Sequence, residues 1–182
     1  MPVFARTKLV IHDDCLAPAP GSPLPGLSYI TINYSGPNPH KVYPEVKKLL
    51  LSVFKFEEKD IQEREVVWNR KGNEESFRIT LEAVEDLDRF TFMQIIVSLN
   101  GKVRPSKEFE KEGEVSIRIE GLLRTEYPQE TLWQRSLLYE MFRMFYHRVI
   151  YESTRARYKE KCKSLIYKFQ DELKKFLNIL GR

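Results

Sequence analysis

The chain has 182 residues and a formal net charge of +4; 42% of the residues are hydrophobic, 31% are charged, and there are only 8 glycines and 10 prolines. This balance excludes a collagen-like or wholly disordered polymer and predicts one globular domain with a buried core. No apolar run approaches the roughly 20 residues of a membrane-spanning helix and no secretory signal opens the chain, so we expect a cytoplasmic protein without a membrane span.

The two cysteines, Cys15 and Cys162, lie far apart in the sequence. Two cysteines cannot build a disulfide framework, and by themselves they cannot supply the four ligands of a structural zinc site. We therefore expect a reducing compartment, and the sequence predicts neither a metal nor a cofactor. His40 and His147 lack the nearby nucleophile and acid of a catalytic group, and there is no glycine-rich phosphate loop, so we expect a non-enzymatic protein.

The first 26 residues are predicted to form a proline-rich arm. They begin with a short apolar and basic stretch, Val3 to Ile11, and continue into a segment whose prolines and glycines prevent regular pairing. The first part of the arm can add an edge strand to a sheet or reach a neighbouring subunit. Its proline content excludes a central strand.

Residues 27–151 are predicted to form the main domain. β-branched and aromatic residues predict a strand over 27–34, and an apolar stripe at helical spacing predicts a helix over 44–55. From residue 61 the hydrophobic period changes to two, which predicts five further strands, at 61–70, 75–83, 89–99, 102–109 and 113–124. Between the third and fourth of these, Asn100-Gly101 is a strong hairpin signal because both turn residues must accept positive φ.

After Pro128, the chain has helical periodicity as far as residue 180. One apolar stripe spans Leu137 to Val149, a second spans Cys162 to Leu180, and the polar stretch 152–161 separates them. A straight helix of about 50 residues would be some 75 Å long, far longer than such a domain is wide. The helix therefore bends back near 152–160 or its end projects, and we treat 152–182 as a basic amphipathic helical extension.

The predicted elements are a strand, paired short helices, five antiparallel strands and a long closing helix. This order resembles the helix-grip fold of the START-related (SRPBCC) superfamily. The strand at 113–124, which runs through GLLRTEYP into the closing helix, is similar to that family's final strand and helix. The resemblance covers roughly residues 27–150. It implies an α+β fold in which a curved antiparallel sheet of about six strands grips a long C-terminal helix, commonly around an apolar ligand cavity, and it implies no chemistry.

Positive charge gathers at the end of the chain. Residues 129–182 hold twelve lysines and arginines against six acids, and tyrosines are interleaved among them. Such a surface, if it is continuous and faces water, can bind phosphates while aromatic rings stack on unpaired bases. The sequence thus predicts contact with RNA or a ribonucleoprotein such as the ribosome through Arg143, Arg148, Arg155, Arg157, Tyr158, Lys159, Lys161, Lys163 and Lys168. The alternative is an ordinary solvated helix face.

Two sets of largely apolar side chains each have two interpretations. The first set has the spacing of a helix that packs either in a homodimer interface or back on its own domain: Leu165, Ile166, Phe169, Leu173, Phe176, Leu177 and Leu180. The second set either lines a cavity between sheet and helix or fills an ordinary core: Phe77, Ile79, Phe92, Gln94, Ile96, Ile117, Ile119, Leu138 and Phe142. A carrier or sensor of a small hydrophobic ligand is therefore the alternative to RNA contact.

Overall fold

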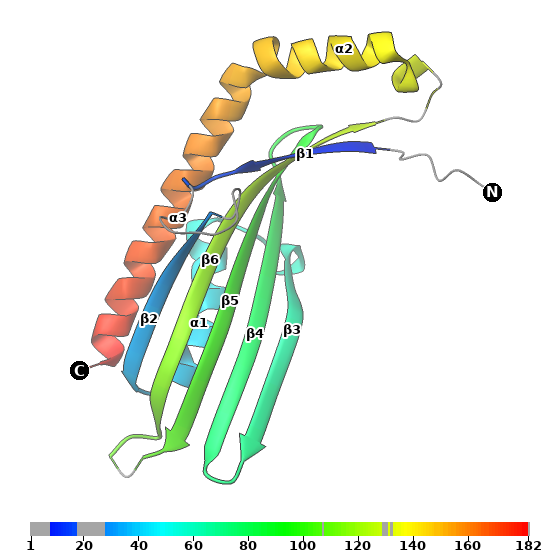
Figure 1. Ribbon diagram of the computed structural model, residues 1–182. Coiled ribbons are helices and arrows are strands. Elements are labelled where there is room, and N and C mark those ends of the chain that lie inside the picture. The colour runs from blue at the N-terminus through cyan, green and yellow to red at the C-terminus, as the bar shows by residue number, and fades with distance from the viewer. Residues whose placement is uncertain (1–7, 18–27, 107, 129–130, 132, 182) are drawn as a thin grey trace, which may run out of the picture.

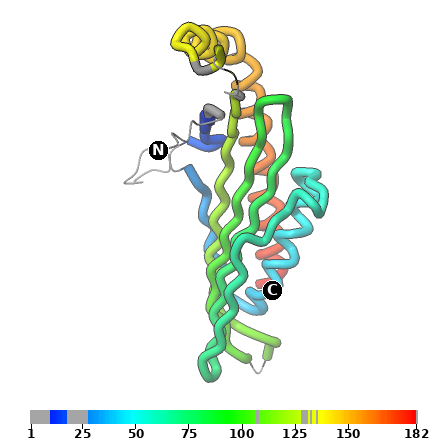
Figure 2. Tube along the Cα trace, turned by 90° about the vertical axis from the view of Figure 1, so that its right-hand side faces the viewer, coloured from blue at the N-terminus to red at the C-terminus, as the bar shows by residue number. Residues whose placement is uncertain are grey.

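The computed structural model describes residues 8–17, 28–106, 108–128, 131 and 133–181. These residues form an α+β fold in which a curved antiparallel sheet carries helices α1 (Val42–Val53) and α3 (Glu152–Leu180) on one face (Figure 1). The side view confirms that both helices lie on the same side of the sheet (Figure 2). The predicted fold class, a curved sheet of six strands with a long C-terminal helix, is confirmed.

The six described strands make one sheet. They are β1 (Lys8–Asp14), β2 (Tyr29–Pro37), β3 (Ile61–Lys71), β4 (Glu74–Asp86), β5 (Thr91–Pro105) and β6 (Lys111–Pro128), in the order β1-β6-β5-β4-β3. Both β1 and β2 pair with β6, β1 with residues 122–128 and β2 with residues 112–120, so they lie end to end along one edge. The predicted edge strand is confirmed from Lys8 to Ile11, whereas parts 1–7 and 18–26 of the predicted arm lie outside the described residues.

The core lies between the sheet and the two helices. Period-two alternation buries every second side chain on one sheet face, with Leu81, Val97 and Ile117 completely inaccessible. Helix α1 adds its buried stripe from Val42 to Val53. Helix α3 packs beside α1 and closes the core with Cys162, Ile166, Phe169, Leu173 and Leu177.

The predicted dimer interface along α3 is wrong. The chain bends at Tyr151 and folds back, so that Ile166, Phe169, Leu173 and Leu177 are buried in the core of their own domain. The remaining three side chains of that set are partly buried against the same core: Leu165, Phe176 and Leu180. Residues 152–182, predicted to be an extension, therefore complete the domain as far as they are described, and this stripe has little surface left for a second copy.

The predicted ligand cavity is also wrong. Its proposed lining is divided between the two faces of the sheet. Four of the residues are buried on the face that carries the helices: Phe77, Ile79, Ile117 and Ile119. Successive side chains of a strand point to opposite faces, so Phe92, Gln94 and Ile96 lie on the other face. Leu138 and Phe142 belong to helix α2 (Leu137–Phe145), which lies at one end of the molecule away from the sheet face (Figure 1). Side chains of α1 and α3 fill the space in which the cavity was expected.

Asn100-Gly101 is not a turn. Strand β5 continues from Thr91 through both residues to Pro105, so two predicted strands are one long strand that ends before β6 begins at Lys111. The glycine is required for another reason: a Cβ at position 101 would overlap the ring of Phe77 on the neighbouring strand β4. The Asn100 side chain accepts a hydrogen bond from Arg78 Nε at 3.0 Å.

Cys15 and Cys162 form a disulfide bond that joins the end of β1 to the middle of α3. Both residues are buried. Gly121 on β6 leaves room mainly for Ile166, whose Cδ1 a Cβ there would overlap, and such a Cβ would also lie 3.3 Å from Cys15 Cβ and Cys162 Sγ. A single bond is not a disulfide framework. Disulfides persist mainly in oxidising surroundings, so this bond does not support the expectation of a reducing compartment, which stays a prediction.

Candidate functional site

The segment after β6 forms a helical arm at one end of the molecule. A short 3-10 turn (Trp133–Arg135) leads into α2, and a π-helical turn (Tyr146–Ile150) connects α2 to α3. Ser136 caps α2 because its Oγ accepts a hydrogen bond from the Tyr139 backbone N–H at 3.2 Å. Figures 1 and 2 both show α2 lying across the end of the long axis, with α3 descending from it beside the sheet.

The amphipathicity of this arm is inverted. A helix on a globular protein normally turns its apolar stripe to the core, yet the buried residues of α2 and the π-helical turn are Arg143 and His147. Eight apolar side chains face water instead, each between 57% and 74% exposed. We call them the α2 apolar surface: Leu137, Leu138, Met141, Phe142, Met144, Phe145, Val149 and Ile150.

Polar contacts hold the basic side of the arm against the domain. The Arg143 guanidinium lies 6.0 Å from the ring centroid of Tyr127 on β6. Within α2 itself, Arg143 lies equally far from the Tyr139 ring and forms an ion pair with Glu140 at 3.1 Å. His147 Nδ1 lies 2.8 Å from Tyr127 Oη, at the end of β6. These contacts fix the rotation of the arm and so turn its apolar side away from the protein.

The contact with Arg155 decides which ring nitrogen of His147 carries the proton. The two side chains are joined at 3.1 Å between Arg155 Nη1 and His147 Nε2, and Arg155 lies 3.7 Å from the Asp13 carboxylate of β1. A guanidinium has donors and no acceptor, so Nε2 must accept this hydrogen bond. The imidazole is therefore neutral, and its Nδ1–H donates to Tyr127.

A second group of hydrogen bonds fixes the bend between α2 and α3. Tyr151 Oη donates to Asp88 Oδ2 at 2.5 Å and lies 2.6 Å from Thr91 Oγ1. Burial acts to raise the pKa of Asp88, but the hydrogen bonds from Tyr151 and from the backbone N–H groups of Phe90 and Thr91 hold this pKa below its usual value. An ionised Asp88 thus ties the bend to the start of β5.

We predict that acid weakens the fold through His147. Burial and the neighbouring Arg155 guanidinium lower the pKa of His147 below its ordinary value of about 6.5. Below about pH 6.5 the unfolded chain binds a proton that the folded chain still excludes, so the free energy of unfolding falls as the pH drops from there toward the folded-state pKa. Urea unfolding between pH 8 and pH 5 measures this loss, and His147→Gln should flatten the profile.

His40 is the comparison for this experiment. Burial also lowers the pKa of His40, so His40→Gln removes a separate and parallel contribution, and the double variant should give the flattest profile. A His147→Gln profile that runs parallel to that of the unsubstituted protein would contradict the assignment of a buried neutral imidazole.

The predicted RNA-contact residues do not share one surface. Arg143 is buried, Arg155 is bonded to His147 and Asp13, and Lys161 lies 3.6 Å from the Glu85 carboxylate. Helical spacing distributes the rest over different sides of the arm and of α3, with Tyr158 and Lys163 half-buried and four cations exposed: Arg148, Arg157, Lys159 and Lys168. The expectation of one continuous water-facing basic surface is therefore wrong.

The apolar stripe of α2 is visible in the sequence, where two of its residues, Leu138 and Phe142, are predicted to line a cavity or fill a core. Periodicity marks which side of a helix is apolar, and it does not tell what lies opposite that side. The sequence signal was the pair Arg143 and His147, which lie four residues apart on the polar side of the helix. Contacts of such polar side chains with the domain turn the apolar side of the helix outward. Met144 and Ile150, outside the stripe found in the sequence, extend the exposed surface.

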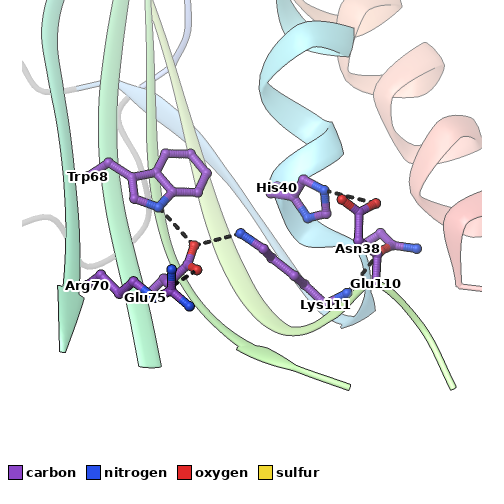
Figure 3. Close-up of polar contacts among 7 residues, drawn as sticks. All are labelled: Asn38, His40, Trp68, Arg70, Glu75, Glu110 and Lys111. Atoms are coloured by element: carbon purple, nitrogen blue, oxygen red, sulfur yellow. Dashed lines mark hydrogen bonds and ion pairs between the residues drawn. The ribbon is translucent and has the colours of Figure 1, made fainter. Parts of the chain in front are cut away.

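A polar cluster at the other end of the sheet is structural (Figure 3). Glu75 is only 8% exposed and accepts hydrogen bonds from Trp68 Nε1 at 3.0 Å and Lys111 Nζ at 2.6 Å, which hold the pKa of Glu75 below its usual value. The Asn38 side chain accepts from the Lys111 backbone N–H at 3.2 Å. The cluster joins the ends of β3, β4 and β6, and its carboxylate is already fully engaged.

A hollow of about 830 Å³ lies over the open face of the sheet. Asparagine, serine and charged side chains line it, and several of them hydrogen bond to one another, as Ser116 Oγ does to Asn33 Oδ1 at 2.8 Å. The described part of the chain holds no group of three or more histidine, cysteine or acidic residues placed to bind a metal.

Comparisons with known proteins assign no family. No family model matches the chain, and no curated protein matches it. Among solved structures, the protein of unknown function SA2116 from Staphylococcus aureus is similar over 85% of this chain and 96% of its own, with 10% sequence identity and a TM-score of 0.26. Within the described residues, no helix is both long and apolar enough to cross a membrane.

Proposed function

We propose that this is a non-enzymatic protein that docks on the surface of a lipid bilayer through the α2 apolar surface. The observation that carries the proposal is the inverted helix, whose Arg143 and His147 side chains are buried and contact Tyr127 of the domain while eight apolar side chains face water. An interfacial helix lies in the plane of the membrane with its apolar side in the boundary between headgroups and acyl chains. It needs no membrane-spanning segment.

The size of the surface supports docking. Eight large side chains that are each more than half exposed amount to a patch on the order of 1,000 Å², whereas the largest patch on a typical monomer is about 300–600 Å². Burying half of it at about 25 cal/mol per Å² would contribute on the order of 10 kcal/mol before the entropic costs of association. Such a surface favours an apolar environment over water.

The shape of the surface favours a lipid layer over a second copy of the chain. The six apolar residues of α2 span an arc of about 160° around the helix, at 3.6 residues per turn. A helix that pairs with another helix uses a narrower seam, whereas a helix half-immersed in an interface uses a wide arc. Trp133 and Tyr146 flank the surface and are 60% and 40% exposed, and these two residue types prefer the membrane interface.

The position of the arm also suits a planar target. Because α2 lies across the end of the long axis in both views, a membrane can contact its whole length while the sheet points away (Figures 1 and 2). Contact with RNA stays a prediction that rests on the exposed cations alone.

We predict that Phe142→Glu weakens binding to vesicles of 70% phosphatidylcholine and 30% phosphatidylglycerol at least tenfold. Phe142 is 68% exposed, so the substitution removes a buried contact from the membrane complex without removing one from the fold. Co-sedimentation with the vesicles measures the affinity. Ile179→Glu is the matched control, since Ile179 is 73% exposed on a helix at the far end of the molecule and its variant should bind like the native protein.

The molecular mass of the protein in solution without lipid tells whether the α2 apolar surface binds a lipid layer or a second copy of the chain. We expect a monomer by light scattering. A stable dimer that Phe142→Glu separates would overturn the proposal and assign the surface to a second copy. Absence of vesicle binding by a monomeric protein would overturn it as well.

A further inference from the structure

Three exposed cations lie in or soon after the segment that carries the α2 apolar surface. Arg148 lies in the π-helical turn between Phe145 and Val149, and Arg157 and Lys159 lie in the first turns of α3. All three are exposed, and among the residues that the structure describes none of them forms an ion pair with a carboxylate. Arg157 packs over the Tyr158 ring at 5.8 Å.

The charge of this region stays positive after internal pairing. Residues 146–163 contain six basic and two acidic side chains. Asp13 and Glu85, from β1 and β4, approach Arg155 and Lys161. Within residues 146–163 this leaves Arg148, Arg157, Lys159 and Lys163 against Glu152 and Glu160, so this segment keeps an excess of positive charge beside the apolar surface.

Distance along α3 separates these cations from the others. At 1.5 Å per residue, Arg157 and Lys159 lie about 9 and 12 Å beyond Tyr151, where the helix leaves the arm. Their long side chains therefore lie within about one Debye length of a membrane that holds α2, since that length is about 8–10 Å at physiological salt. Lys168 and Lys174 lie about 25 and 35 Å from the same point, which is beyond the range of the headgroups.

We infer that the docking surface is selective for anionic phospholipids, and that Arg148, Arg157 and Lys159 bind the phosphate groups of acidic headgroups while α2 enters the interface. The inference rests on the proposed docking and adds the class of lipid to it. A basic residue close to an anionic leaflet contributes binding additively, and salt screens that contribution. The inward-facing Arg143 and Arg155 do not take part.

The experiment compares two vesicle compositions at two salt concentrations. Affinity for vesicles with 30% phosphatidylglycerol should exceed that for pure phosphatidylcholine at least tenfold, and the difference should shrink at high salt. Arg157→Gln with Lys159→Gln should reduce the difference about tenfold and leave binding to pure phosphatidylcholine unchanged. Lys168→Gln with Lys174→Gln removes the same charge at the far end and should have no effect.

The outcomes separate this inference from the proposed function. Equal, salt-independent binding to both vesicles overturns the lipid selectivity while the docking stands. Equal losses from the two double variants overturn the role of Arg157 and Lys159. Absence of binding to either vesicle overturns both, and association with RNA that the Arg157 and Lys159 variant loses would then assign these cations to a nucleic acid.

Discussion

A chain in which Cys15 and Cys162 are both replaced by alanine is expected to lose about 3–5 kcal/mol of unfolding free energy. The disulfide joins residues separated by 147 positions, and a crosslink that closes a long loop restricts the unfolded chain strongly. Since small domains are stable by only about 5–15 kcal/mol, this is a large share of the total. Urea unfolding of the native and doubly substituted chains under oxidising conditions measures the difference.

Reduction is the control for the disulfide. Both sulfurs are buried, so a reductant attacks the bond mainly in unfolded molecules. With dithiothreitol throughout the titration, the native chain should unfold like the alanine variant, and the variant should not respond. A native chain with the same unfolding free energy in the presence and absence of reductant would contradict the bond.

The alternation of apolar residues was sufficient to predict most of the sheet. The predicted strands at 75–83 and 113–124 lie within β4 and β6, and the odd-numbered residues that the pattern marks as apolar, such as Ile79 and Ile117, face the core. Alternation succeeds here because one sheet face is covered by helices and the other is open, so each strand carries a two-residue period.

The path of the closing helix could not be decided from the sequence. The polar stretch 152–161 is compatible with a projecting end and with a helix that lies on the edge of the core. What selects the second is a set of contacts between distant residues, namely Tyr151 with Asp88 and Cys162 with Cys15. Neither pairing has a local signal, because sequence separation does not report distance in the fold.

The candidate site was missed for a related reason. An apolar stripe on a helix is the same pattern whether it meets a core, a partner or a membrane. The orientation of α2 depends on Tyr127, which receives His147 and Arg143 at the end of β6. Only the fold brings these groups together, so the exposure of Phe142 and its neighbours follows from the tertiary structure.

The Asn100-Gly101 pair shows how a local signal is overridden. The dipeptide favours a tight hairpin turn, but in β5 the glycine admits the Phe77 ring of the adjacent strand. A glycine can be required because the backbone has a positive φ or because a neighbouring group approaches closely. A single sequence does not tell which of these two reasons applies. The structure makes them distinguishable by experiment.

Gly101→Ala is expected to lower the unfolding free energy by about 2–3 kcal/mol. Glycine within a strand ordinarily costs about 0.5–1 kcal/mol relative to alanine, so without a steric conflict the substitution would stabilise the protein. Here the new Cβ would overlap the Phe77 ring, which is 3% exposed and stacks on Trp68 with ring centroids 5.0 Å apart. The ring would have to leave its position against Trp68 to admit the Cβ, and we expect this cost to exceed the gain from replacing glycine.

Phe77→Leu provides the background that tests this cause. The shorter side chain lacks the ring atoms that the Cβ would meet, so Gly101→Ala should cost about 1–2 kcal/mol less in that background than in the native chain. Urea unfolding of the four chains measures the coupling. Equal costs in both backgrounds would show that another neighbour opposes the Cβ, and a stabilised Gly101→Ala chain would mean that β5 and β4 do not pack as closely as the structure requires.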